Sequence, residues 1–316
     1  MISRDSVGLR IKQGLAAAAI RLLGRLPLSF LHRLGAQLGR LVVWFPNRQR
    51  RNALINIGLC RQDLTRAEQV ALRNAHLVEF GKTYFEIAYL WRQPADKVLG
   101  LVREVRGGEL LTRREGRGLI VLSPHIGAWE LAGLYLAAQG PTAIFYKPQK
   151  YIDDLILAAR ARGGASMAPT TAKGVRLLVQ ALERGDYVGL LPDQEPKSDK
   201  GAVFAPFFTV PALTMLLVSR LARKTGAPVV FLFAERLAAS RGFRLHCLPA
   251  PPGIDSPDEQ VAARALNLGI EHCIGVCPEQ FLWTYKRFRR RPPGHPRLYS
   301  GGLEDAQVFA RLPGSN

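Results

Sequence analysis

A histidine and a glutamate at either end of the segment 125–130 are the residues whose types and spacing best suit chemistry. They follow the apolar run Gly118–Leu122, which predicts a short buried strand, and the residues after them predict a helix. His125 is therefore expected at the carboxyl end of a strand, where open α/β sheets place their ligands. A neutral imidazole there can take a proton from a hydroxyl group, and a nearby carboxylate can fix the imidazole tautomer.

This pair works only if the histidine lies in a turn before the helix. Five residues along an ideal helix leave about 140° between two side chains, so they would not share a face. Pro124 and Gly127 favour such a turn, and Glu130 would suit the positive end of the following helix. The alternative is a surface histidine beside an ordinary N-terminal glutamate.

Two basic residues follow predicted elements near the same edge. Lys147 comes after the predicted strand 141–146, and Arg160 lies late in the predicted helix 150–162. A guanidinium or ammonium group at strand ends can bind phosphate or another anion. The alternative for each is a solvated surface charge.

A second polar group follows the predicted strand 187–191. Asp193 and Gln194 are expected to face the same edge as His125. The aromatic segment Val203–Phe208 comes next, and it would either line a slot for an acyl chain or pack in the core.

The motifs of several enzyme classes are missing from the sequence. It contains no Gly-x-Ser-x-Gly elbow, no phosphate loop of the Gly-x4-Gly-Lys type and no dinucleotide fingerprint. Of the mechanisms considered, attack by a substrate hydroxyl group that a protein base deprotonates is the one that remains. The four cysteines form no disulfide pattern, and His272-Cys273-x3-Cys277 lacks a second ligand pair, so we expect core thiols, a reducing compartment and no metal.

The formal net charge of +19 is the unusual feature of the composition, and it favours an anionic partner. Residues 1–60 hold ten Lys or Arg and one acid, spaced between apolar residues. The stretches 8–26 and 28–45, separated by Pro27, predict two amphipathic helices in a membrane interface. Arginines interrupt both, so neither is expected to span a membrane. The alternative is a helical pair packed on the core.

The remaining pattern predicts an α/β fold: a mixed, mostly parallel central sheet flanked by helices and preceded by the amphipathic helices. We expect a membrane-anchoring segment at 1–60, a catalytic domain at 61–292 and an irregular tail at 293–316. Thr65 and Glu68 form a candidate capping box. The expected strands are 100–105, 118–123, 141–146, 187–191, 228–234 and 243–248; the expected helices are 47–59, 65–90, 107–115, 128–139, 150–162, 171–184, 212–225 and 257–273.

The basic and aromatic run Phe281–Arg291 suggests nucleic-acid binding at first sight. Aromatic residues are only 8% of the chain, and no nucleic-acid module signature appears. We therefore interpret the run as a patch facing a membrane or an acidic carrier protein, and we expect no nucleic acid.

Taken in order, these segments resemble a known family. His125-x4-Glu130 matches the H-x4-[DE] signature of the glycerol-phosphate acyltransferase superfamily. Five further blocks make the chain similar to the late acyltransferases of lipid A biosynthesis, the lauroyl/myristoyl transferase family, over residues 8–292. Ala128 and Lys147 depart from residues common in that family. The blocks are Phe145–Pro148, Arg160–Gly163, Asp193–Pro196, Val203–Phe208 and Phe281–Phe288.

The resemblance implies transfer of a fatty acyl chain from acyl carrier protein to a hydroxyl group of a lipid A precursor, without a cofactor. His125 would be the general base and Glu130 would orient it. The backbone N–H groups of Gly127 and Ala128, at the helix start, are candidate donors to the oxyanion. The other site residues would bind the acceptor phosphate (Lys147 and Arg160) or shape the site (Asp193 and Gln194).

The implied partners are acyl carrier protein, a lipid A precursor and an anionic membrane surface. The implied location is the cytoplasmic face of the bacterial inner membrane. Two alternatives stay open. In the first, the chain is an acyltransferase whose acceptor is another lipid, such as a lysophospholipid or an ornithine lipid. In the second, the chain is a basic membrane-binding protein without catalytic activity.

Overall fold

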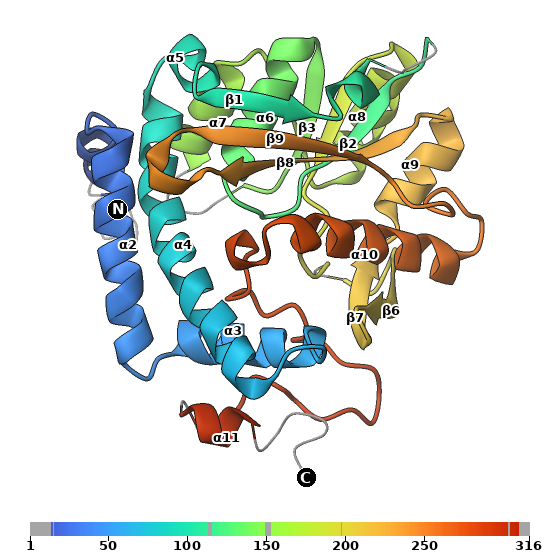
Figure 1. The fold of residues 1–316 in the computed structure, drawn as a ribbon. Coiled ribbons are helices and arrows are strands. Elements are labelled where there is room, and N and C mark those ends of the chain that lie inside the picture. Colours follow the sequence, from blue (N-terminus) through green and yellow to red (C-terminus); the bar gives the residue numbers. More distant parts are fainter. Residues whose placement is uncertain are drawn as a thin grey trace, which may run out of the picture.

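A seven-stranded sheet forms the centre of the computed structural model (Figure 1). The structure describes residues 14, 16–112, 116–148, 153–196, 198–302 and 304–309. The strand order is β1-β9-β8-β2-β5-β3-β4, and every neighbouring pair is parallel except β8 and β9. The strands are β1 (Val102–Arg106), β2 (Leu119–Leu122), β3 (Thr142–Tyr146), β4 (Ser166–Pro169), β5 (Tyr187–Leu190), β8 (Val229–Arg236) and β9 (Phe243–Pro249).

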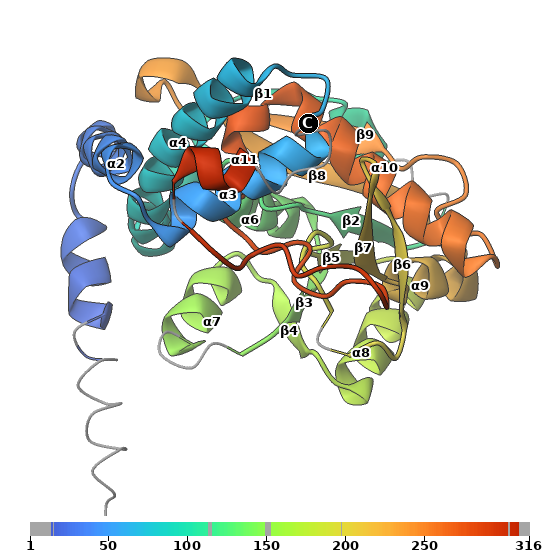
Figure 2. The same cartoon turned by 90° about the horizontal axis from the view of Figure 1, so that it is seen from below.

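Helices cover both faces of this sheet, so the predicted mixed and mostly parallel α/β architecture is confirmed (Figures 1 and 2). One apolar cluster joins the sheet to α2, α4 and α6, and another joins it to α3, α8, α9 and α10. The helices are α2 (Leu28–Trp44), α3 (Arg48–Cys60), α4 (Arg66–Arg92), α5 (Ala95–Leu99), α6 (Trp129–Gln139), α7 (Asp153–Ala161), α8 (Ala172–Glu183), α9 (Leu217–Thr225), α10 (Glu259–Val276) and α11 (Asp305–Phe309).

The strands at the centre of the sheet were predictable because they are continuous apolar runs. All four residues of β2 and of β5 are buried, as expected for parallel strands covered on both faces. The two strands pair in register from Leu119 opposite Tyr187 to Leu122 opposite Leu190. Their carboxyl ends therefore lie side by side.

Several predictions of local structure were wrong or incomplete. The predicted helix 212–225 begins as a strand, because β7 (Val210–Met215) pairs antiparallel with β6 (Ala202–Phe207) before α9 starts. The edge strand β4, the strand β6 and the short helices α5 and α11 were not predicted. Helix α11 lies within the segment 293–316, which was expected to be irregular. The predicted helix 107–115 is a single 3-10 turn over Gly108–Leu111 within its described part.

Other local signals are confirmed. The hydroxyl of Thr65 accepts a hydrogen bond from the backbone N–H of Glu68, and the Glu68 carboxylate accepts one from the N–H of Thr65. This capping box starts α4. Likewise, α2 begins directly after Pro27, where the break between the two basic helices was predicted.

Helix α2 lies along α4 at one side of the molecule (Figure 1). Its buried side contains Leu31, His32 and Gly35, whereas its apolar residues Leu41 and Trp44 are exposed. Residues 16–23 before it are helical, and the rest of the predicted helix 8–26 lies partly outside the described residues. None of the described helices has the length and apolar character needed to cross a bilayer.

Candidate active site

His125 lies in a turn between β2 and α6, as its spacing from Glu130 required. The chain leaves β2 at Leu122, and α6 begins at Trp129. Gly127 has φ +55°, and a Cβ there would collide with the backbone oxygen of Ala234 on β8. Glycine is therefore needed to pass the chain over the neighbouring strand.

The carboxylate that contacts His125 is that of Asp193. Nδ1 of His125 lies 2.7 Å from Oδ1 of Asp193, and the backbone N–H of His125 donates to Oδ2 at 3.0 Å. Asp193 follows β5, the neighbour of β2, so the adjacent strand ends bring the two residues together. Both are buried, with relative exposures of 7% and 3%.

These contacts fix the protonation pattern. Burial alone would raise the pKa of Asp193, but the charge and hydrogen bonds of His125 outweigh it, so that pKa lies below its ordinary value. An ionised carboxylate accepts the Nδ1–H of the imidazole. The other nitrogen, Nε2, then carries the lone pair that can accept a proton.

Two side chains border that nitrogen and its ring. Nε2 of Gln194 lies 3.3 Å from Nε2 of His125, so the Gln194 amide donates to the lone pair. The ring of Trp129 lies 5.0 Å from the imidazole, centroid to centroid. The structure thus brings together His125, Asp193 and Gln194, which the sequence placed at one sheet edge.

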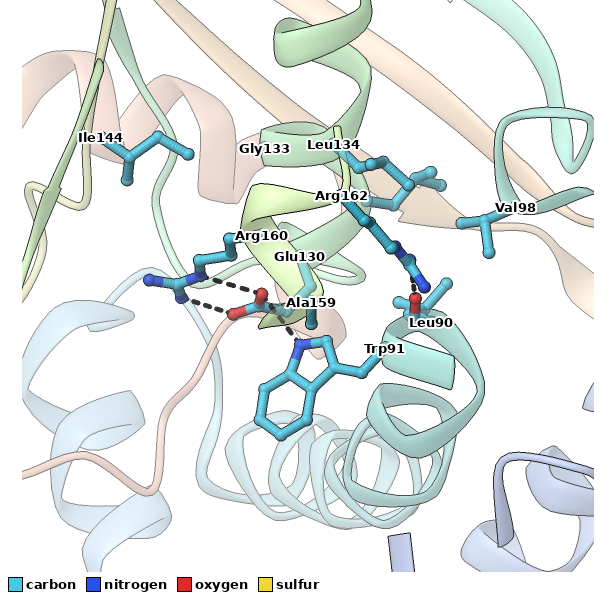
Figure 3. A pocket seen from close by; sticks show the side chains of 11 residues that line it. Leu90, Trp91, Val98, Glu130, Gly133, Leu134, Ile144, Ala159, Arg160 and Arg162 are labelled. Atoms are coloured by element: carbon cyan, nitrogen blue, oxygen red, sulfur yellow. Dashed lines mark hydrogen bonds and ion pairs between the residues drawn. The ribbon is translucent and has the colours of Figure 1, made fainter. Parts of the chain in front are cut away.

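Glu130 makes different contacts from those expected. Its carboxylate accepts hydrogen bonds from Arg160 at 2.6 and 3.2 Å and from the indole N–H of Trp91 at 3.0 Å (Figure 3). Among the described contacts none is a hydrogen bond between Glu130 and His125. The expected orienting contact is therefore made by Asp193, because Glu130 sits on α6 and points toward α4 and α7.

Each member of this ion pair shifts the pKa of the other toward the charged form. Burial would raise the pKa of Glu130, but the positive charge of Arg160 outweighs it and lowers that pKa, and the charge of His125 adds a smaller effect of the same sign. Glu130 in turn raises the pKa of Arg160 against the effect of burial. The guanidinium also lies 5.3 Å from the centroid of the Tyr146 ring. Lys147 follows β3 directly and is exposed.

The two backbone donors proposed for the oxyanion are already used. The N–H of Gly127 donates to the carbonyl of Gln280 at 3.1 Å, and that of Ala128 donates to the carbonyl of Ala234 at 2.9 Å. In this conformation neither N–H points into an open site. The turn at Gly127 packs its backbone against β8 and against η3 (Pro278–Gln280), which the local sequence pattern could not indicate.

The aromatic segments turn out to be core. Phe207, of the segment 203–208, is 1% exposed and packs against Phe281 and Phe288. Trp283 is also 1% exposed. The interpretation of 281–291 as a surface patch is therefore wrong for Phe281, Trp283 and Phe288, which are all buried. The burial of Phe207 favours the core alternative over an acyl slot.

A small apolar cavity of about 40 Å³ lies instead between α6 and the sheet. Glu130 and Arg160 stand at it together with Trp129 and Ser123, and Leu136 and Leu232 are among its apolar walls. The hydroxyl oxygen of Ser123 is buried and has no hydrogen-bond partner among the described residues. A second small cavity, of about 10 Å³, is also bordered by this ion pair and is lined in addition by Trp91 (Figure 3).

Several residues around the site were not predicted. Trp91 binds Glu130, Gln280 holds Gly127, and the hydroxyl of Tyr285 accepts the N–H of Glu195 next to Gln194. Each comes from a distant segment, and only the aromatic run around Tyr285 gave any sequence signal. The four cysteines are buried free thiols, and no group of three metal-binding side chains occurs within the described ranges.

Comparison with known proteins identifies the class. The chain belongs to the bacterial lipid A biosynthesis acyltransferase family, whose sequence profile matches residues 9–290. It is therefore an acyltransferase enzyme, and its buried His–Asp pair lies at the carboxyl ends of two central strands.

Three relatives from Escherichia coli (strain K12) match most of the chain. A lipid A biosynthesis palmitoleoyltransferase is 30% identical over 87% of this chain and 90% of its own length. A lauroyltransferase is 29% identical over 90% of this chain and 94% of its own. A myristoyltransferase is 26% identical over 90% and 89%, respectively.

Proposed function

We propose that this acyltransferase moves a fatty acyl chain from the thioester of acyl carrier protein to a hydroxyl group of a lipid A precursor, with His125 as general base. The contact of Asp193 with Nδ1 of the imidazole carries the proposal, because it leaves Nε2 as the basic atom. Membership of the family supports the substrate class.

The reaction would proceed in two proton transfers. Nε2 of His125 takes the proton of the acceptor hydroxyl as its oxygen attacks the thioester carbonyl carbon. Asp193 stabilises the resulting imidazolium. When the tetrahedral intermediate collapses, the carbon–sulfur bond breaks, and the imidazolium returns the proton to the departing thiolate. The products are an ester and free carrier thiol.

General-base catalysis supplies about 10²–10⁴-fold, so the developing oxyanion also needs a donor. The amide of Gln194 already points its N–H at Nε2 of His125. The incoming hydroxyl must displace this contact, after which the amide lies beside the reacting atoms. We assign Gln194 the role of donor in place of the backbone N–H groups of Gly127 and Ala128.

Glu130 is assigned a supporting role through Arg160. Their pair fixes α7 against α6 beside the cavity, with Trp91 of α4 as a third member. Arg160 and Lys147 remain the proposed phosphate contacts of the acceptor. Arg160 would reach an anion while keeping Glu130, because its guanidinium uses Nε and one terminal nitrogen on that carboxylate.

The exposed face of α2 is proposed to lie in the membrane interface. Arg33 and Arg40 are exposed on the same helix and would contact anionic headgroups. The proposed location is the cytoplasmic face of the inner membrane, where an acidic carrier protein would reach the enzyme. The exposed apolar residues of the helix and the turn after it are Phe30, Leu38, Leu41, Trp44 and Phe45.

The test is transfer by the purified protein from radiolabelled acyl carrier protein to a lipid A precursor, a lysophospholipid and an ornithine lipid in parallel. We expect the lipid A precursor to be acylated and His125→Ala to lose transfer while keeping vesicle binding. Preferred acylation of another lipid would overturn the acceptor, and an active His125→Ala would overturn the mechanism. Mass spectrometry of lipid A from cells with and without the protein gives the independent readout.

A further inference from the structure

A third and larger cavity lies away from the His–Asp pair, between α3 and residues of the stretches 296–302 and 307–308. Helices α3 and α11 are neighbours there (Figure 2). The volume of the cavity is about 320 Å³. Ile55, Leu298 and Val308 give it an apolar wall, and Arg51 and Arg297 give it positive charge. None of its lining residues borders the cavities beside Glu130.

Arg51 is a buried cation without an acidic partner in the described part of the chain. It is 8% exposed. One terminal nitrogen donates to the carbonyl of Gly301 at 3.1 Å, the other lies 3.4 Å from Oδ1 of Asn52, and Nε has no partner. An arginine stays charged in a protein, and a buried charge is costly unless a counter-ion accompanies it.

The charges around the cavity make the imbalance larger. Arg48, Arg50 and Arg51 lie near the start of α3, which has no acidic residue in its first turn. The positive end of a helix dipole disfavours cations there. Asp305 of α11 ion-pairs with Arg50 at 2.9 Å and with Arg73 at 2.8 Å, so its charge is already shared.

We propose that this cavity binds the phosphate headgroup of an anionic amphiphile, with the phosphate on Arg51 and the first apolar atoms against Ile55, Leu298 and Val308. The apolar wall favours an amphiphile over free phosphate. The position supports a lipid source, because α3 begins only four residues after Trp44, which stands at the end of the exposed apolar face of α2.

The experiment is calorimetric titration of the purified full-length protein with soluble dihexanoyl phosphatidic acid, dihexanoyl phosphatidylcholine and inorganic phosphate. We expect phosphatidic acid to bind at least about tenfold more tightly than either of the others. Arg51→Leu should weaken the binding of phosphatidic acid at least about tenfold, because the variant loses a charge-assisted hydrogen bond to the phosphate. Arg48→Gln is the matched control, because it also removes one positive charge from the start of α3, but at an exposed residue that does not line the cavity. It should change the binding of phosphatidic acid by less than about twofold.

A second variant tests the apolar wall without changing charge. Val308→Phe should fill the cavity and weaken phosphatidic acid binding while leaving the weak binding of inorganic phosphate. Arg51→Leu should also raise the melting temperature of the free protein, because it removes an uncompensated buried charge. His125→Ala should bind phosphatidic acid as the wild type does, which separates this site from the proposed acyl transfer.

Three results would overturn the proposal. They are equal losses in Arg51→Leu and Arg48→Gln, equal affinity for phosphate and phosphatidic acid, or unchanged binding in Val308→Phe. If Arg51→Leu does not fold, the comparison of Val308→Phe with Arg48→Gln decides the question alone.

Discussion

Asp193 holds His125 through both its side chain and its backbone, with Nδ1 at 2.7 Å and the backbone N–H at 3.0 Å. Asp193→Asn keeps the size of the side chain but replaces the carboxylate by an amide, which can donate to Nδ1 and favour the wrong tautomer. We expect transfer to fall by about 10²–10⁴-fold. Steady-state kinetics with acyl carrier protein thioester measures this, and unchanged activity would exclude Asp193 from the mechanism.

Glu130 and Arg160 should behave as a coupled pair. Glu130→Gln leaves a mostly buried guanidinium without its charge partner, so we expect a loss of roughly 1–3 kcal/mol in the free energy of unfolding and a lower transfer rate. The double variant with Arg160→Gln should lose less than the sum of the two single variants. Strict additivity in urea unfolding would show that the two side chains act independently.

Gln194 provides the test of the oxyanion assignment. Gln194→Leu keeps the bulk beside Nε2 of His125 but removes the N–H donor. We expect kcat for transfer to fall by about 10²-fold with little change in KM, because the oxyanion that the amide would stabilise develops only in the transition state. Leu177→Ser on the distant helix α8 serves as a control for preparation and stability. A change confined to KM would assign Gln194 to substrate binding instead.

The sequence predicted the features that depend on local pattern. The strand before His125, the turn at Gly127 and the helix after it all follow from apolar runs and turn residues within a few positions. The histidine's partner does not, because the contact with Asp193 depends on β2 and β5 being neighbours in the sheet. Asp193 was expected near His125 at the carboxyl ends of the strands. The H-x4-[DE] signature, however, led to the prediction that Glu130 orients the imidazole.

The basic aromatic run near residue 283 shows a second limit. Its composition resembles that of a binding surface, yet Trp283 and Phe288 are buried and Arg287 lies between them with 3% exposure. The reason is tertiary: the β6–β7 hairpin supplies Phe207 as a packing partner and the Leu213 carbonyl as an acceptor for Arg287. Neither contact is encoded near the run itself.

The buried His76 of α4 predicts that the protein loses stability in acid. Burial lowers its pKa from 6.5 to about 4, and its only described hydrogen bond joins Nδ1 to the carbonyl of Glu279 at 3.3 Å. The unfolded chain therefore binds a proton between these values that the folded chain does not. The contribution of His76 to the free energy of unfolding is therefore complete above pH 6.5. It is lost as the pH drops toward 4, by about 3 kcal/mol in total.

His76→Leu should remove this part of the pH dependence. Urea unfolding at pH 8 and pH 5 measures it, with an expected difference of about 2 kcal/mol in the wild type from this residue alone. The variant should show a smaller difference by that amount. An equal pH dependence in both proteins would mean that His76 is protonated in the folded state.

The exposed face of α2 should carry membrane binding. Trp44 and Leu41 are 79% and 54% exposed, and they lie on the side of the helix opposite to its contact with α4. Replacing both by serine removes two large apolar side chains that would enter the bilayer interface, so partitioning into anionic vesicles should fall at least about tenfold. Since neither side chain is buried in the protein, the melting temperature should stay within a few degrees of wild type, whereas His32→Ala should lower it by breaking the buried contact with Glu86. Vesicle sedimentation of the double serine variant is compared with that of Leu177→Ser, which replaces an exposed apolar residue on α8. If α2 lies in the membrane interface, only the double serine variant should lose vesicle binding. If α2 is an ordinary packed helix, both variants should bind vesicles equally.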